Sequence, residues 1–109
     1  MPKMVILDSL CEAVRGCQEL RLSMQRDPRG ATRTGEPHIV YESSARNVLL
    51  HVYQTAGHSS SGGLPAWRPL KVGEIVSAQP TGRKFAVRWQ EGYNPANRRF
   101  YRRIICAVK

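Results

Sequence analysis

The sequence predicts a mainly β domain of the α+β class, in which one N-terminal helix precedes about four to six short strands in a small, strongly bent sheet or barrel. Three observations lead to this prediction. Apolar residues recur at helical spacing near the start, several later segments alternate apolar and polar residues, and clusters of Gly, Pro, Ser and Asn separate those segments. A length of 109 residues suits a single domain, residues 1–109, because it allows one hydrophobic core.

The first element is expected to be a helix over about residues 4–16. Apolar residues at positions 6, 10, 13 and 17 form a stripe with helical spacing, which is typical of a helix that covers a core. Ser9 to Glu12 has the form of a capping box, so the helix begins either near Lys3 or at Ser9. Gly16 is expected to end it.

Strands are expected between about residues 18 and 90. The clearest covers residues 19–25, and others cover 38–42, 47–53, 67–72 and 85–89. Pro69 places the strand at 67–72 at a sheet edge or a bulge. Residues 73–78 form either a short helical turn or a bent strand, and the glycine- and serine-rich residues 57–65 form a hairpin loop. Residues 98–108 favour a strand over a helix because Ile104, Ile105 and Val108 are β-branched.

Positive charge is the strongest feature of the composition. The chain has 17 Lys and Arg against 8 Asp and Glu, a net charge of +9, and residues 83–109 alone hold eight basic residues and one acid. The basic segment at 93–109 includes Arg98, Arg99, Arg102 and Arg103. Such a concentration predicts a polyanionic partner, and nucleic acid or a nucleotide fits better than a membrane because no amphipathic apolar helix accompanies it. The alternative is a solvated surface that only aids solubility.

Catalytic and metal-binding motifs are absent from the sequence. It contains no G-x-S-x-G, no phosphate-binding G-x-x-x-x-G-K-[ST] and no H-E-x-x-H, so we predict no enzyme activity, no catalytic residue, no metal site and no cofactor. Cys11, Cys17 and Cys106 are odd in number and fit no metal spacing, which favours buried, reduced thiols over a catalytic cysteine. The chain shows neither a membrane span nor a signal peptide, so a cytoplasmic location is expected.

The candidate binding site lies on the strand at 47–53. His51 and Tyr53 share one face of that strand, and Arg68 falls on the neighbouring strand if residues 57–65 close a hairpin. An imidazole, a phenol and a guanidinium suit a ligand with a flat ring and a phosphate. His51 by itself is equally consistent with a partly buried strand histidine, and Arg68 with an internal pair to Glu36 or Glu74.

The spacing of three segments resembles the WYL domain, a small sensor module found mostly in bacterial transcriptional regulators. Residues 36–38 are similar to the family's proline-led entry, residues 48–53 to its Trp-Tyr-Leu strand, and residues 68–75 to its Arg-x-Phe-x-Leu-x-Arg-Ile segment. The resemblance covers about residues 5–90. Val48 and Leu49 stand where the family has Trp and Tyr, Leu70 replaces its Phe, and Glu74 replaces its second Arg.

The resemblance implies an Sm-like or SH3-like fold and a non-enzymatic regulatory module that binds a nucleotide or single-stranded nucleic acid, in transcriptional or defence regulation. It implies a ligand role for Arg68, beside His51 and Tyr53, with the basic residues near the end of the chain adding electrostatic reach. No helix-turn-helix precedes the module, so a stand-alone sensor or accessory subunit is expected. The alternative is a protein-interaction or dimerisation subunit, possible as a homodimer or with a regulatory partner, without a nucleic-acid ligand.

Overall fold

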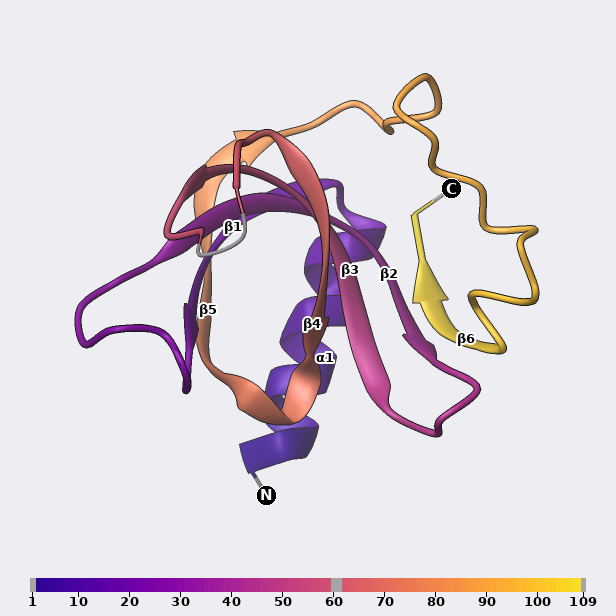
Figure 1. Ribbon diagram of the computed structural model, residues 1–109, viewed down its shortest axis with the longest axis horizontal. Helices are drawn as coiled ribbons and strands as arrows, with labels where there is room; N and C mark the ends of the chain where they lie inside the picture. Colours follow the sequence, from indigo (N-terminus) through magenta and orange to yellow (C-terminus); the bar gives the residue numbers. More distant parts are fainter. Residues whose placement is uncertain (1, 60–61, 109) are drawn as a thin grey trace.

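The computed structural model describes residues 2–59 and 62–108, with side chains from Ile6 onward. One helix precedes six strands, and a single 3-10 turn lies among them (Figure 1). The elements are α1 (Pro2–Arg15), β1 (Gln18–Met24), β2 (Arg33–Glu42), β3 (Val48–Gly57), β4 (Ala66–Lys71), η1 (Val72–Glu74), β5 (Ile75–Lys84) and β6 (Arg103–Ala107). Residues 60 and 61 of the predicted loop, and Lys109 of the basic segment, lie outside the described residues.

The strands form one antiparallel sheet in the order β4-β3-β2-β1-β5, and β6 pairs with β2 off this path. The turn η1 joins the two edge strands β4 and β5, and the Gln25 backbone N–H donates to the Glu74 carbonyl oxygen at 2.7 Å. The sheet therefore bends so strongly that its two edges approach each other (Figure 1). This confirms the predicted fold class: mainly β of the α+β kind, with one small, strongly bent sheet and an N-terminal helix.

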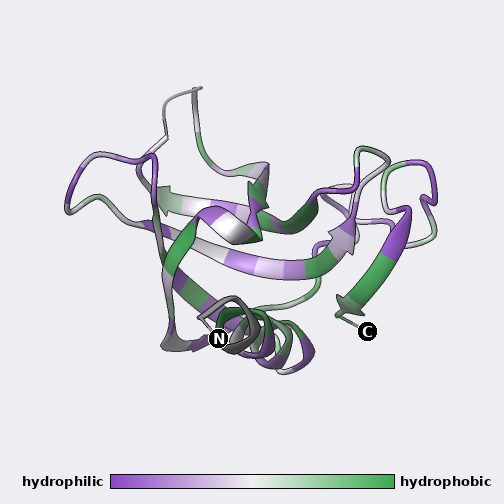
Figure 2. Cartoon of the chain, turned by 90° about the horizontal axis from the view of Figure 1, so that it is seen from below, coloured by the Kyte–Doolittle hydropathy of each residue, from purple (hydrophilic) through white to green (hydrophobic). Residues whose placement is uncertain are grey.

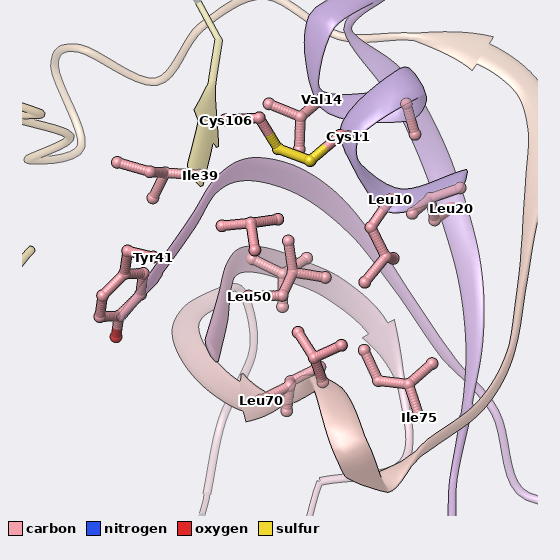
Figure 3. Packing of buried hydrophobic residues seen from close by; sticks show 14 of the residues in the cluster. Leu10, Cys11, Val14, Leu20, Ile39, Tyr41, Leu50, Leu70, Ile75 and Cys106 are labelled. Carbon is pink, nitrogen blue, oxygen red and sulfur yellow. A yellow bond between two sulfur atoms is a disulfide. The ribbon is translucent and has the colours of Figure 1, made fainter. Parts of the chain in front are cut away.

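Alternation of apolar and polar residues places the core on the concave side of the sheet. Leu20 and Leu22 of β1, Leu50 and Val52 of β3, and Leu70 of β4 are buried. Figure 2 shows hydrophobic and hydrophilic residues following one another along the strands. The helix closes this core with side chains that point toward the sheet (Figure 3), and these are Leu10 and Val14. Removal of this apolar area from water is the main favourable contribution to folding.

The helix spans Pro2–Arg15, so of the two predicted starts the earlier is correct, and its end before Gly16 is confirmed. Cys17 follows in the left-handed region at φ 52°. The predicted reduced state of the thiols is wrong for two of the three cysteines, because Cys11 and Cys106 form a disulfide (Figure 3), with Cα atoms 5.7 Å apart and 95 residues between them in sequence. Helix α1 packs against β6, which brings the two cysteines together. The spacing of the cysteines in the sequence does not predict this contact.

Two strands differ from the predictions near the end of the chain. Residues 85–89 are not a strand: β5 covers Ile75–Lys84 instead, and residues 85–88 have no regular structure. The backbone N–H of Arg88 donates to His38 Nε2 at 3.0 Å, so a side chain takes the place of a sheet partner. The predicted strand at 98–108 is confirmed only for β6, Arg103–Ala107. No helix in the described part of the chain is long and apolar enough to cross a membrane.

Candidate functional site

The outer face of β3 carries the predicted pair His51 and Tyr53. Cross-strand partners of His51 and Tyr53 on β4 are Pro69 and Trp67, and the Tyr53 ring lies 5.1 Å from the Trp67 ring. The two predicted residues therefore share one face, as the period of the strand requires. Both are only partly exposed.

Residues 85–102, which we call the covering segment, lie over this outer face. Figure 1 shows them in orange, running outside the sheet from β5 to β6. Tyr101 Oη lies 2.8 Å from His51 Nδ1, and the Phe100 ring stacks on the His51 ring at 5.1 Å. The Arg88 guanidinium lies 4.8 Å from the centre of the Tyr53 ring, a cation–π contact. The outer face of β3 is thus covered by the chain itself.

Burial keeps His51 neutral. Desolvation, with a smaller contribution from His38, lowers the pKa of His51 from 6.5 to about 4. Desolvation also raises the pKa of Tyr101, so at neutral pH two uncharged groups share the hydrogen bond. His51 therefore offers no positive charge to a phosphate.

The covering segment is held by a buried carboxylate on β2. Glu36 is 6% exposed and accepts two hydrogen bonds from the Arg88 guanidinium, at 2.7 and 3.0 Å. This pairing raises the pKa of Arg88. His38, fully buried, has Nδ1 at 2.9 Å from the Glu36 carbonyl oxygen, and burial lowers the His38 pKa. The neutral ring donates at Nδ1 and accepts the Arg88 N–H at Nε2, so both ring nitrogens are satisfied.

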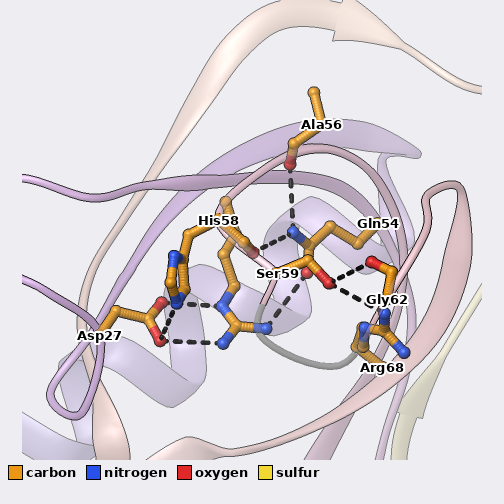
Figure 4. A network of polar contacts seen from close by, with 8 residues as sticks. Asp27, Gln54, Ala56, His58, Ser59, Gly62 and Arg68 are labelled. Atoms are coloured by element: carbon orange, nitrogen blue, oxygen red, sulfur yellow. Dashed lines mark hydrogen bonds and ion pairs between the residues drawn. The ribbon is translucent and has the colours of Figure 1, made fainter.

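Arg68 lies on β4, as predicted, but on the other face of the sheet. Its cross-strand partner is Val52, a core residue, whereas His51 and Tyr53 point outward. Its Nη2 donates to Ser59 Oγ at 3.0 Å (Figure 4), and its buried Nε has no hydrogen-bond partner among the described residues. Neither predicted carboxylate serves it: Glu36 binds Arg88, and Glu74 lies 3.3 Å from Arg26. Arg68 and the pair on β3 do not form one open site.

A second polar network closes the end of the sheet near Arg68. Asp27 accepts two hydrogen bonds from Arg33, at 2.8 and 2.9 Å, which lowers the Asp27 pKa (Figure 4). Arg33 also donates to the buried Gln54 side chain at 3.3 Å, and Gln54 donates to the His58 carbonyl oxygen at 2.7 Å. Sequence reasoning missed this network because its members come from two loops and two strands. Its groups are mutually satisfied, so we assign it a structural role.

One hollow of about 330 Å³ lies in the covering segment beside Arg88, Trp89 and Glu91, and two others lie away from the outer face of β3. A polar cleft of about 380 Å³ borders the Asp27 network, and a mainly apolar one of about 400 Å³ lies beside Leu7, Val48 and Val72. Within residues 6–59 and 62–108, no three His, Cys, Asp or Glu side chains lie close enough together to hold a metal ion. None of these hollows is lined by His51, Tyr53, Arg68 or the four predicted arginines near the end of the chain.

The four predicted arginines gather at the end of the covering segment and the start of β6. All four are exposed, and we call them the basic cluster: Arg98, Arg99, Arg102 and Arg103. Arg103 lies 3.3 Å from Glu42, and the other three have no carboxylate partner among the described residues. Phe100 stands within this cluster and is 43% exposed. Phe100 belongs to the segment 98–108 that is predicted as a strand, and nothing in the sequence pattern marks it as a binding residue.

Comparison of the chain with protein-family models, with curated proteins and with solved structures gives no match.

Proposed function

We propose that this chain is a non-enzymatic binding module for a nucleotide or single-stranded nucleic acid, and that it acts in transcriptional or defence regulation in bacteria. One observation carries the proposal: an exposed aromatic ring, Phe100, lies among four exposed arginines on a segment that the fold holds in place. Arginine binds phosphate through charge-assisted, bidentate hydrogen bonds. An aromatic face stacks on any base, so the combination suits single strands.

His51 and Tyr53 take an indirect part in this proposal. His51 supports the inner side of Phe100, and Tyr53 contacts Arg88, so both position the covering segment. Arg68, on the opposite face, lies away from the basic cluster and is left out of the proposed contact surface. The resemblance to the WYL domain supports a nucleotide-type ligand, while the proposed contact lies outside the region of resemblance.

The proposal is tested with a fluorescein-labelled single-stranded oligonucleotide and fluorescence anisotropy. The variant Arg98→Ser, Arg99→Ser, Arg102→Ser is expected to lose at least about tenfold in affinity, because it removes three phosphate partners. The matched control, Arg15→Ser, Arg21→Ser, Arg83→Ser, removes the same charge from exposed positions on α1, β1 and β5. Equal losses in the two variants would reduce the effect to net charge and contradict the proposed site.

A protein-interaction or dimerisation role is the second candidate, and β6 favours it. This short strand pairs with β2 along one edge and with no other strand in the described part of the chain, so its other edge has no strand partner there. Unpaired strand edges can bind a further strand from a partner or a second copy. Size-exclusion chromatography with light scattering distinguishes the two roles. A stable dimer that binds neither nucleotides nor oligonucleotides favours this candidate.

We place the proposed module in the cytoplasm, where a regulator of this kind acts. The bond between Cys11 and Cys106 is the observation against this placement, because the cytosol keeps most protein thiols reduced. Whether this bond is present in cells is tested by alkylation of the protein in rapidly lysed, denatured cells, followed by mass spectrometry. Three alkylated cysteines support the cytoplasm, and one alkylated cysteine, Cys17, would place the protein in an oxidising compartment.

A further inference from the structure

Two aromatic side chains of the covering segment are strongly exposed. Trp89 is 54% exposed and Phe100 is 43% exposed, although each belongs to a residue type that is usually buried. They stand at the two ends of the covering segment. Exposed aromatic rings of this kind are typical of binding surfaces.

Each exposed ring is fixed from one side. Phe100 stacks on His51 at 5.1 Å with 28° between the rings, and it lies 5.6 Å from Tyr41. Trp89 packs on Tyr93 at 5.2 Å. Tyr41 and Tyr93 are buried, so these supports belong to the core. Phe100 rests one face on His51 and Trp89 leans on Tyr93 at 43°, so each ring is supported from one side and its exposed part is available for stacking.

A continuous row of ring contacts connects the two exposed residues through the sheet. From Trp89 the row passes to Tyr93 at 5.2 Å, to Trp67 at 6.2 Å, to His51 at 4.9 Å and to Phe100 at 5.1 Å. Trp67 also donates its indole N–H to the Glu91 carbonyl oxygen at 2.8 Å, which ties the turn that carries Trp89 to β4. The contacts with the sheet therefore fix the relative position of the two exposed rings. Binding of a ligand then costs little conformational entropy, because few side chains have to be ordered.

The charge around this row selects the ligand. Arg98, Arg99 and Arg102 are exposed beside Phe100, whereas the covering segment contains one acid, Glu91. The Glu91 carboxylate lies 3.9 Å from Arg88, which reduces its repulsion of a polyanion. A protein partner that used both aromatic residues would have to be strongly acidic. A nucleic-acid strand supplies the rings and the negative charge together.

We infer that the ligand is a single strand of several nucleotides, with one base stacked on Phe100 and another on Trp89 and its phosphates beside the basic cluster. This inference rests on the proposed function and narrows it, because a mononucleotide has one base and can use one ring only. Three further rings lie between the two platforms in the row. About four nucleotides is the lower end of the site sizes of small single-strand-binding barrels, and we expect a site of about that length.

The test measures affinity for oligothymidylates of one, two, four and eight nucleotides, each used to compete with a labelled octamer. Affinity is expected to rise steeply up to about four nucleotides. For the octamer, Phe100→Leu and Trp89→Leu are each expected to lose about five- to a hundredfold, because each removes one stacked base. The conservative change Trp89→Phe keeps a ring and is expected to stay within about threefold of the unchanged protein. The control Val76→Ser alters another exposed apolar residue, 64% exposed on β5.

The outcomes separate the two proposals. If the arginine variant weakens binding while Trp89→Leu has no effect and affinity does not depend on length, the two-platform inference is wrong and the proposed function stands. If no oligonucleotide or nucleotide binds, both fail. Circular dichroism shows whether a leucine variant is folded. If it is not, Trp89→Phe and Trp89→His are compared instead. Equal loss of affinity in these two variants overturns the inference.

Discussion

At the scale of single residues, Arg88 connects the covering segment to the sheet through several bonds at once. Its guanidinium binds both carboxylate oxygens of Glu36 and lies over the Tyr53 ring, and its backbone N–H donates to His38. Burial of a carboxylate that is 6% exposed costs free energy unless a cation and hydrogen bonds compensate it. The Arg88–Glu36 pair therefore matters more for stability than an ion pair on the surface.

Arg88→Gln is expected to lower the free energy of unfolding by about 3 kcal/mol, because it leaves the buried Glu36 carboxylate without its cationic partner. The matched control is Arg103→Gln, which breaks a pair with Glu42 at a side chain that is 62% exposed and is expected to cost less than about 1 kcal/mol. Urea denaturation followed by tryptophan fluorescence measures both. Equal costs would show that the Glu36 pair is not the attachment of the covering segment.

His51 is expected to make stability depend on pH. Its pKa is about 4 when folded and near 6.5 when unfolded, so between these values the unfolded chain binds more protons. The contribution of neutral His51 is complete above pH 6.5 and is lost as pH falls toward 4. At pH 5 the loss is about 2 kcal/mol.

Denaturant unfolding at several pH values checks this expectation by comparing the protein with His51→Gln, since the carboxylates contribute equally to both. The variant is expected to lose less stability between pH 7 and pH 5. A difference between the two proteins that stays constant over that range would show that His51 titrates normally and is not shielded by Phe100 and Tyr101.

At the scale of elements, β6 holds both ends of the chain together. It pairs with β2, it follows the basic cluster, and its Cys106 is bonded to Cys11 of α1. The bond joins residues separated by 95 positions, so it closes almost the whole chain into a loop. In the chain-entropy description, a cross-link of this span restricts the unfolded chain far more than the folded one.

The variant Cys11→Ala, Cys106→Ala is expected to lose about 4 kcal/mol of stability under oxidising conditions, because the unfolded chain regains the entropy of an open loop. With a reducing agent present, the unchanged protein is expected to approach the stability of the variant. Cys17→Ala, at a partly exposed free thiol, serves as the control and is expected to change stability by less than about 1 kcal/mol. A melting temperature that does not change when a reducing agent is added would show that the disulfide does not contribute to stability.

At the scale of the whole molecule, charge is distributed unevenly. The chain carries +9, and residues 83–109 hold eight basic residues and one acid. Much of this charge lies on a segment outside the sheet, where it disturbs neither the core nor the strand pairing. The fold therefore tolerates a density of arginines that would be costly inside the sheet, and it presents them to an anionic partner.

Binding to a single strand is expected to weaken with salt, because each neutralised phosphate releases counterions. With three arginines in contact, the slope of log K against log salt concentration is expected to be about −2, and the triple serine variant of the basic cluster should bring it close to zero. Anisotropy titrations from low to moderate potassium chloride measure the slope. A slope unchanged by that variant would show that other cations make the phosphate contacts.

Local patterns and distant contacts differ in how far the sequence predicts them. The alternation in residues 19–25 predicts a strand with one buried side, and in β1 that side is formed by Leu20, Leu22 and Met24, because burial on one face of a strand repeats every second residue. Alternation also placed His51 and Tyr53 on one face of β3. It could not show what covers that face, since Tyr101 is 50 residues from His51.

The sequence by itself determined the fold class, the period and approximate position of most strands, the end of α1 and the concentration of positive charge, because these depend on residues near each other in the chain. The tertiary structure decided three things: that Cys11 meets Cys106, that Arg68 lies on the other face from His51, and that the chain covers its own outer face. Such contacts depend on register and on the path of irregular segments, and neither leaves a periodic pattern in the sequence.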